Sequence, residues 1–143
     1  MIIAIGNDHA GVEVKERIQQ HLINSGHKVI NKGYDGEESV DYPDYIHRVA
    51  EEVEEKKADI GIIVCGSGNG AAMTANKHQG VRAAICWNKE IAKLAKQHNN
   101  ANVISIPSRF LEKKEIEEII TAFLESKFEG GRHERRVKKI PKQ

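Results

Sequence analysis

The sequence predicts an α/β fold with a five-stranded parallel sheet and helices on both faces. Short apolar runs alternate with segments whose apolar residues recur three or four positions apart, the spacing of one helix face. The run at residues 60–64 is apolar apart from Gly61, as expected for a strand buried on both faces of a parallel sheet. Repeated β-α units imply right-handed crossovers. A length of 143 residues suits one domain with its own core.

The first half of the chain supplies two strands and two helices. Two glycines end elements in this half: Gly6 follows the first apolar run, and Gly26 is a residue type that commonly ends a helix. A polar loop rich in turn residues is expected at 34–42. The elements expected on either side of this loop are a strand at 2–5, a helix with Val14, Ile18 and Leu22 on one face, a strand at 28–31, and a helix with Ile46, Val49, Ala50 and Val53 on its apolar face.

The second half continues the alternation. After the strand at 60–64 come a glycine-rich loop and a short helix. The remaining expected elements are a strand at 81–86, a helix that carries Ile91, Leu94 and Ala95, a strand at 103–106 ended by Pro107, and a long helix that carries Ile116, Ile120, Phe123 and Leu124. In such sheets ligands bind beyond the carboxyl ends of the strands. This rule selects residues 7–9, 65–70, 87–88 and 107–109.

Composition excludes several classes of protein. Charged residues make up 30% and hydrophobic residues 39%, and no apolar run approaches the roughly 20 residues of a membrane span. Residues 1–6 resemble a first strand rather than a signal peptide, so a cytoplasmic location and no membrane partner are expected. The two cysteines, Cys65 and Cys86, are too few for a disulfide framework. No Cys/His spacing is typical of zinc, and neither a metal nor a cofactor is expected.

The glycine loop at residues 64–70 is the strongest local signal. Its alternating glycines allow backbone N–H groups to approach a phosphate or an oxyanion, although a plain structural turn is an equal alternative. The loop is neither a Walker loop nor a dinucleotide-binding motif. Cys65 enters it, and a thiol near a helix start has its thiolate favoured. The alternative for Cys65 is a small buried apolar side chain, and for Cys86 this alternative is preferred.

Three further groups could carry chemistry. Asp8 and His9 follow the first strand and can handle hydroxyl protons, while Asp8 can also cap the next helix. His98 either caps a helix end or acts as a general acid. In a helical tail, Arg132 and Arg136 would share a face and suit a phosphate. The alternative for this tail is a helix that is simply exposed to solvent and binds nothing.

The tail is also the basic part of the chain. Residues 132–143 hold six Lys/Arg and one acid and carry +5, while the other 16 basic and 20 acidic residues give −4. An acidic body without an aromatic-rich basic face argues against a nucleic-acid partner.

The ordered set of motifs resembles type B ribose-5-phosphate isomerases, a family that includes galactose- and allose-phosphate isomerases. The resemblance covers almost the whole chain, and although each motif is loose, the ordered set is specific. The matching segments are 7–11 (Asn-Asp-His-Ala-Gly), 41–43 (Asp-Tyr-Pro), 65–70 (Cys-Gly-Ser-Gly-Asn-Gly), 75–77 (Ala-Asn-Lys), 98–99 (His-Asn) and 130–136 (Gly-Gly-Arg-His-Glu-Arg-Arg).

The resemblance implies a Rossmann-like three-layer sandwich and a role for each site residue. Cys65 would be the base that moves a proton between C1 and C2, and His98 the acid that opens the furanose ring, assisted by Asp8. Ser67 and the backbone of the glycine loop would hold the enediolate oxygens. The implied substrate contacts are Asp8, His9, Tyr42, Gly66, Ser67, Gly68, Asn69, Gly70 and Asn99; those to phosphate are Arg109, Arg132 and Arg136, with His9 and His133 nearby.

The resemblance also implies how the chain works in the cell. Residues 1–143 would form one domain of a homodimer, which in some members pairs into a tetramer, with 128–143 an arm that reaches the partner subunit. Members without the cysteine place a glutamate just after the glycine loop, where this chain has Ala71, so the carboxylate-base variant is excluded. The expected activity interconverts ribose 5-phosphate and ribulose 5-phosphate in the pentose phosphate pathway. A six-carbon sugar phosphate as substrate, or a non-catalytic phosphosugar-binding protein, stays open.

Overall fold

The computed structural model describes residues 1–142 and confirms the predicted α/β class. Five parallel strands form one sheet in the order β2-β1-β3-β5-β4. The strands are β1 (Ile2–Asn7), β2 (Lys28–Asn31), β3 (Ile60–Cys65), β4 (Ala83–Ile85) and β5 (Val103–Pro107). The helices are α1 (Val12–Asn24), α2 (Tyr42–Glu54), α3 (Asn69–Ala75), α4 (Lys89–Gln97), α5 (Lys113–Glu125) and α6 (Arg132–Val137), with short 3-10 turns η1 (His9–Gly11) and η2 (Ser108–Phe110).

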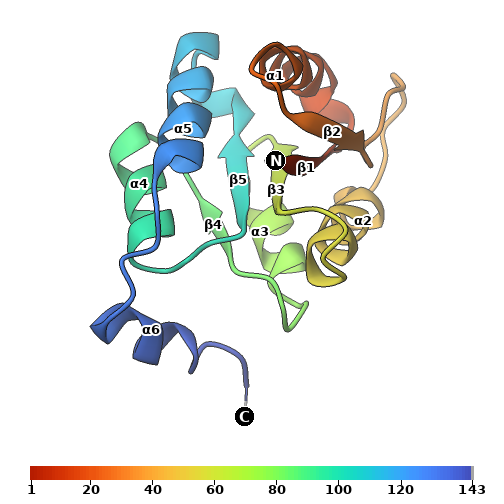
Figure 1. Ribbon diagram of the computed structural model, residues 1–143. Coiled ribbons are helices and arrows are strands. Elements are labelled where there is room, and N and C mark those ends of the chain that lie inside the picture. The colour runs from red at the N-terminus through yellow and green to blue at the C-terminus, as the bar shows by residue number, and fades with distance from the viewer. Residues whose placement is uncertain (143) are drawn as a thin grey trace.

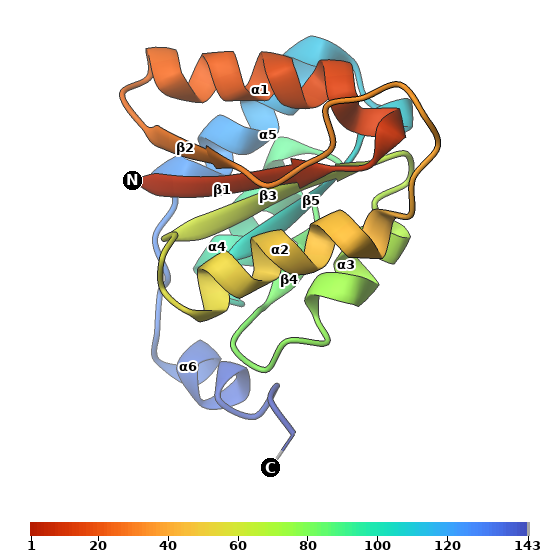
Figure 2. The same cartoon turned by 90° about the vertical axis from the view of Figure 1, so that its right-hand side faces the viewer.

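The helices cover both faces of the sheet, which gives three layers (Figures 1 and 2). One apolar core joins α1, α4 and α5 to the sheet, with Ile5, Ile62 and Ile104 among its fully buried side chains. The other core joins α2 and α3 to the opposite face, around Val49 and Ile63. Within residues 1–142, no helix has the length and apolar character that a membrane crossing requires.

The ends of several elements differ from the predicted ones. β1 runs on to Asn7, and α2 begins at Tyr42, the last residue of the predicted loop. β4 is shorter than the predicted strand at 81–86. It is an edge strand, and the side-chain amide of Asn76 bonds both backbone groups of Ala83, at 2.8 and 2.9 Å. A side chain thus occupies edge positions that a further strand would otherwise pair with.

Candidate active site

Three neighbouring strands deliver the candidate residues to one edge of the sheet. Asn7 at the end of β1 pairs with Val64 of β3, and Cys65 of β3 pairs with Pro107 of β5. Because the strands are parallel, the residues that follow them emerge together at the carboxyl edge. Asp8, Cys65 and Ser108 therefore surround one place, as the sequence pattern predicts.

Cys65 is buried at this edge beside Asp8, with 6% of the residue exposed. Burial is the main reason that the pKa of its thiol is raised from 9.0 to about 12. The Asp8 carboxylate adds to the rise through its charge and by accepting a hydrogen bond from the thiol, while the Asp8 backbone N–H opposes it. The expectation that a helix start favours the thiolate is wrong for the chain alone, because burial and the Asp8 carboxylate raise the pKa of the thiol instead.

Asp8 also caps η1, because one of its carboxylate oxygens accepts a hydrogen bond from the backbone N–H of Ala10 at 2.9 Å. The two roles considered for Asp8 from the sequence therefore coexist. His9 is exposed beside it, and its Nδ1 accepts from the backbone N–H of Val40 at 3.1 Å. A buried thiol against a buried carboxylate is a pair that can pass a proton from one to the other.

The glycine loop follows Cys65 directly and is tied to the neighbouring strand β5. Gly68 has a left-handed backbone (φ 79°), and its carbonyl accepts a hydrogen bond of 2.8 Å from the buried hydroxyl of Ser105 on β5. A Cβ at Gly68 would stand 3.0 Å from that hydroxyl. Gly68 is the N-cap of α3 and has no side chain that could cap the helix. N–H groups in the first turn of α3 can therefore donate to a ligand. Ser67 is exposed next to them, and its Oγ accepts weakly from Asn69 N–H, at 3.3 Å.

Two further predicted residues lie against this loop. A Cβ at Gly70 would fall 2.5 Å from the ring of Tyr42, so the tyrosine ring lies directly on the glycine. A Cβ at Gly66 would lie 3.2 Å from the Arg109 side chain, and the backbone N–H of Arg109 donates to the Gly66 carbonyl at 3.1 Å. The glycines thus make room for a phenol and a guanidinium at the mouth of the site.

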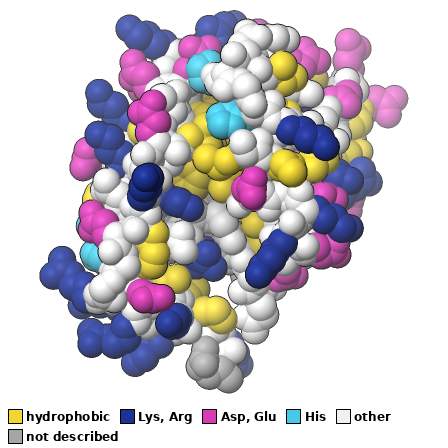
Figure 3. Space-filling view, in the orientation of Figure 1, with side chains coloured by type: hydrophobic (Ala, Val, Ile, Leu, Met, Phe, Trp, Pro, Cys, Tyr) yellow, Lys and Arg dark blue, Asp and Glu magenta, His cyan; other side chains and the backbone are white. Residues whose placement is uncertain are grey.

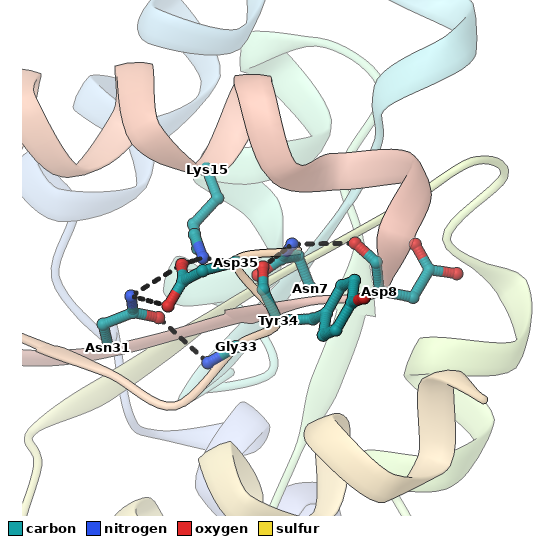
Figure 4. Close-up of polar contacts among 7 residues, drawn as sticks. All are labelled: Asn7, Asp8, Lys15, Asn31, Gly33, Tyr34 and Asp35. Carbon is teal, nitrogen blue, oxygen red and sulfur yellow. Dashed lines mark hydrogen bonds and ion pairs between the residues drawn. The ribbon is translucent and has the colours of Figure 1, made fainter. Parts of the chain in front are cut away.

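A buried polar network holds the Asp8 backbone in place (Figure 4). The side-chain amide of Asn7 donates to the carbonyls of Asp8 at 2.7 Å and Tyr34 at 2.8 Å. The ammonium of Lys15, whose side chain is fully buried, also donates to the Tyr34 carbonyl, at 2.9 Å, and pairs with Asp35. The Lys15 hydrogen bond is the largest of the causes that lower the pKa of Asp35. The loop before α2 is thereby tied to the end of β1.

The remaining predicted residues lie at the opposite edge of the sheet. Helix α4 follows β4 and leads back to the start of β5, so its C-terminal end lies at the amino-terminal edge. His98 caps this end, and exposed Asn99 follows it. Figures 1 and 2 place α6, with exposed Arg132 and Arg136, beyond the β4 side of the sheet and away from the carboxyl edge. One chain therefore does not bring these residues to Cys65.

At that opposite edge His98 meets the tail. Its ring stacks on that of His133, with centroids 4.2 Å apart and planes 9° apart. Both Nε2 atoms face one carboxylate oxygen of Glu129, at 3.5 Å from His98 and 3.6 Å from His133. Partial desolvation and then the charges of His98 and Arg132 lower the pKa of His133, while Glu129 opposes this.

Sequence reasoning missed several residues that contact the Cys65 site or the His98 and His133 pair. Ser105 interrupts an apolar strand, and Lys15 stands three positions before Ile18 on the buried face of α1, so a polar residue at an apolar position was the available signal. Glu129 carried no such signal, whereas Ser108, whose hydroxyl donates to the Cys65 carbonyl at 3.1 Å, lies in the segment 107–109 that the strand-end rule selects. Cys86 is fully buried, as preferred from the sequence, and burial raises the pKa of its thiol to about 12.

Comparison with known proteins adds independent information. The family model described as Ribose/Galactose Isomerase matches residues 3–140. Ribose-5-phosphate isomerase B of Escherichia coli is 41% identical over 138 residues, which cover 96% of this chain and 93% of that protein.

Solved structures are equally similar. A ribose 5-phosphate isomerase of Thermotoga maritima superposes with a TM-score of 0.97 at 43% identity, over 99% of this chain and 98% of that one. Ribose-5-phosphate isomerase B of Mycoplasma genitalium with bound ribulose 5-phosphate gives a TM-score of 0.94 at 42% identity, over 97% and 93% of the two chains.

Proposed function

The chain belongs to the ribose/galactose isomerase family, and from this premise we propose that it interconverts ribose 5-phosphate and ribulose 5-phosphate through an enediolate. One observation carries the chemistry: a buried thiol, Cys65, lies against a buried carboxylate, Asp8, at the start of a glycine loop. An aldose–ketose isomerase needs a base for the proton next to a carbonyl and a sink for the charge that develops. In this proposal Cys65 with Asp8 provides the base, and the glycine loop provides the groups that stabilise the developing charge.

Cys65 is the proposed base. In the resting chain it is a protonated thiol, because burial and Asp8 hold its pKa at about 12. Asp8 accepts the thiol's hydrogen bond and can take the proton, leaving a thiolate and a neutral carboxyl group. The thiolate then removes the proton from C2 of the open-chain aldose, which gives the enediolate. The thiol formed in this way delivers a proton to C1 while the proton of the C2 hydroxyl moves to the C1 oxygen, which gives the ketose. The energetic cost of ionising the thiol would be offset by nearby cationic groups, such as the Arg109 guanidinium that lies against Gly66.

The charge of the enediolate would be held by the glycine loop. N–H groups at the start of α3 and the exposed Ser67 hydroxyl bear on the place beside Cys65. Fixed backbone donors stabilise a developing oxyanion without reorganising at the moment of reaction. Gly66, Gly68, Asn69 and Gly70 supply this frame. Tyr42 and His9 line its mouth, where they can contact sugar hydroxyls.

The second part of the site comes, in this proposal, from a second copy of the chain. His98, proposed as the acid that opens the furanose ring, and Asn99 lie at the edge opposite Cys65 in their own chain. The basic arm with Arg132 and Arg136 lies there too, and Figure 3 shows Lys and Arg side chains gathered over α6. A homodimer that places this edge against the partner's Cys65 would complete each site, with Arg109 from the first chain as a third phosphate contact.

A mixed-dimer experiment tests this sharing. Cys65→Ala and Arg136→Ala dimers should each be nearly inactive, and refolding them together in equal amounts makes about half of the dimers hybrid. In a hybrid one site carries both defects and the other carries none, so about a quarter of all sites should recover. If the arm serves its own chain, every hybrid site has one defect. A lack of recovery, with hybrids confirmed by mass, rejects the shared site.

The substrate is tested by comparing turnover of ribose 5-phosphate, allose 6-phosphate and galactose 6-phosphate. Ribose 5-phosphate should give the highest kcat/KM. A preference for either six-carbon sugar would move the assignment within the family. Tight binding of a sugar phosphate without turnover of any would support a non-catalytic phosphosugar-binding protein instead.

We place the reaction in the cytoplasm, because a reducing compartment keeps free thiols such as Cys65 and Cys86 reduced.

A further inference from the structure

The turn that follows α4 carries two of the proposed site residues, His98 and Asn99, and its backbone is unusual. Asn100 has a left-handed backbone, with φ at 46°, which glycine adopts without a steric penalty and asparagine tolerates better than most residues. The N–H of Asn100 donates to the Lys96 carbonyl at 3.1 Å, and the chain leaves the helix here. Because helix ends fray, a bond from outside the helix would hold the side chains of this turn in one place.

Arg82 supplies such a bond from just before the edge strand β4. Its Nε donates to the Asn100 carbonyl at 2.8 Å in a part-buried position. The backbone N–H of Arg82 donates to the side-chain oxygen of Asn102 at 2.7 Å, and the N–H of Asn102 donates back to the Arg82 carbonyl at 3.1 Å. The next residue, Ala83, pairs with Val103 of β5. The residue that holds the turn is therefore itself fixed by the sheet.

The Arg82 guanidinium serves this hydrogen bond rather than an ion pair. Desolvation lowers the pKa of the guanidinium, and no carboxylate among residues 1–142 acts on that pKa in the opposite direction. A hydrogen bond from a charged donor that is partly removed from water is stronger than one between neutral groups. Arg82 also lines a hollow of about 290 Å³ together with Asn99, so the two side chains lie at the same place on the surface.

We propose that Arg82 is a positioning residue for the ring-opening part of the site. Its hydrogen bond to Asn100 fixes the turn that presents His98 and Asn99 to the partner's Cys65. This role rests on the proposed function, in which these two residues act in the site of the other subunit. Arg82 acts through the backbone of the turn and not on the sugar. Because a displacement of about 1 Å in a site group can cost about 10²-fold in rate, Arg82→Met should lower kcat/KM for ribose 5-phosphate by about 10–100-fold.

A matched control separates the hydrogen bond from the positive charge. Lys96 is a neighbouring cation, since desolvation and then the charge of Arg82 lower the pKa of its ammonium group. This group lies over the ring of Phe123, 5.7 Å from the centroid, and within residues 1–142 it donates no hydrogen bond to the turn. Lys96→Met should therefore keep the parent turnover. Equal losses in Lys96→Met and Arg82→Met would overturn the proposal, because the charge at this edge and not the bond would then matter.

Hydrogen exchange of the full-length protein reports on the turn without any substrate. The N–H groups of Asn100 and Ala101 donate to carbonyls of α4 and should exchange faster in Arg82→Met than in the parent, while the N–H groups of β3 and β5 keep their parent rates. Unchanged exchange at these two residues would overturn the proposal. Faster exchange throughout the chain would overturn it as well, because Arg82 would then stabilise the whole fold and not the turn.

Mixed dimers show whether the Arg82 defect travels with His98. Arg82→Met and Cys65→Ala are refolded together in equal amounts. In a hybrid, one site takes Cys65 from the Arg82→Met chain and His98 from the chain with an intact Arg82, so about a quarter of all sites should recover. Arg82→Met refolded with His98→Asn should recover nothing, because each hybrid site lacks either His98 or the bond that holds it. The reverse pattern, or recovery in neither mixture, would overturn the proposal.

Failure of this role and failure of the proposed function give different results. If Cys65→Ala complements Arg136→Ala but not Arg82→Met, the shared site stands and the role of Arg82 is wrong. If Cys65→Ala complements neither variant, the shared site is wrong, and the role of Arg82 in it is wrong too.

Discussion

Replacing Asp8 by Asn should change the reactivity and the activity of Cys65 in opposite directions. Asparagine keeps an oxygen that can accept from Ala10 N–H, so the cap of η1 is retained while the charge is removed. The Asp8 carboxylate raises the pKa of Cys65 through its charge and by accepting a hydrogen bond from the thiol. The variant should therefore have a lower Cys65 pKa and more thiolate at a given pH, yet it should isomerise more slowly because the proton acceptor is gone.

The structure sets the scale of the effect. A rise in the Cys65 pKa from 9.0 to about 12 lowers the thiolate fraction at pH 8 by about 10³-fold. Burial is the first cause of the rise, so Asp8→Asn should recover part of this factor and not all of it. In the parent protein the rate of alkylation should climb tenfold per pH unit through the whole range from pH 7 to 10.

Iodoacetamide labelling followed by mass spectrometry measures this reactivity for each cysteine separately. Cys86 is the internal control, because burial alone raises the pKa of its thiol, and its labelling should not respond to the variant. A saturating sugar phosphate should protect Cys65 more than Cys86. If Asp8→Asn leaves the Cys65 rate unchanged or slows it, the thiol–carboxylate pair does not behave as described.

Three further outcomes are expected. Gly68→Ala should cost about 1–2 kcal/mol of stability from its left-handed backbone and most of the turnover, because the added Cβ meets Ser105 Oγ at 3.0 Å. Lys15→Met should lower the free energy of unfolding by about 1–3 kcal/mol, measured in urea. Since Lys15 lowers the pKa of Asp35 below 3.8, this difference should be full above that pH and shrink as the pH falls through the lowered value. Exhaustive chelation should leave turnover of ribose 5-phosphate unchanged, because backbone amides carry the enediolate charge.

Each of these predictions can be contradicted, and Gly68→Ala has a matched control variant. Gly26→Ala shares the positive φ of Gly68→Ala, at 88°, but its Cβ meets nothing within 4 Å, so it should lose stability and keep activity. Equal turnover losses in both variants would reject the role of the loop. A Lys15→Met difference that persists undiminished at pH 2 would argue against the pairing with Asp35. Loss of activity on chelation that only one divalent ion restores would refute the proposal that backbone amides stabilise the enediolate charge.

Much of the fold was predictable because its signals are local. Buried parallel strands are nearly continuous apolar runs, and the interval from one run to the next leaves room only for a helix. Strand ends were less predictable, since pairing and edge capping decide them. The amide of Asn76 at Ala83 has no counterpart in a local pattern. Likewise, the burial of Lys15 follows from Asp35 and a carbonyl 19 residues away, which apolar periodicity cannot register.

The site was predictable where chain topology dictates it. The strand-end rule places Asp8, Cys65 and Arg109 at one edge, and the structure confirms this grouping. The ionisation of Cys65 was mispredicted, because the Asp8 charge and the depth of burial depend on the packed strand ends rather than on the helix that follows. The meeting of His98, Glu129 and His133 arises from the return of the chain after α5, and spacing along the sequence does not reveal it.

The most direct test of Cys65 as the base is proton exchange measured in D₂O. The parent protein should place deuterium from solvent at C2 of ribose 5-phosphate and at C1 of ribulose 5-phosphate as it interconverts them. Cys65→Ala should bind ribose 5-phosphate with nearly the parent affinity, measured by calorimetry, and incorporate no deuterium at either carbon. Deuterium incorporation by Cys65→Ala at a rate near that of the parent would contradict the account, because another group would then be removing the proton.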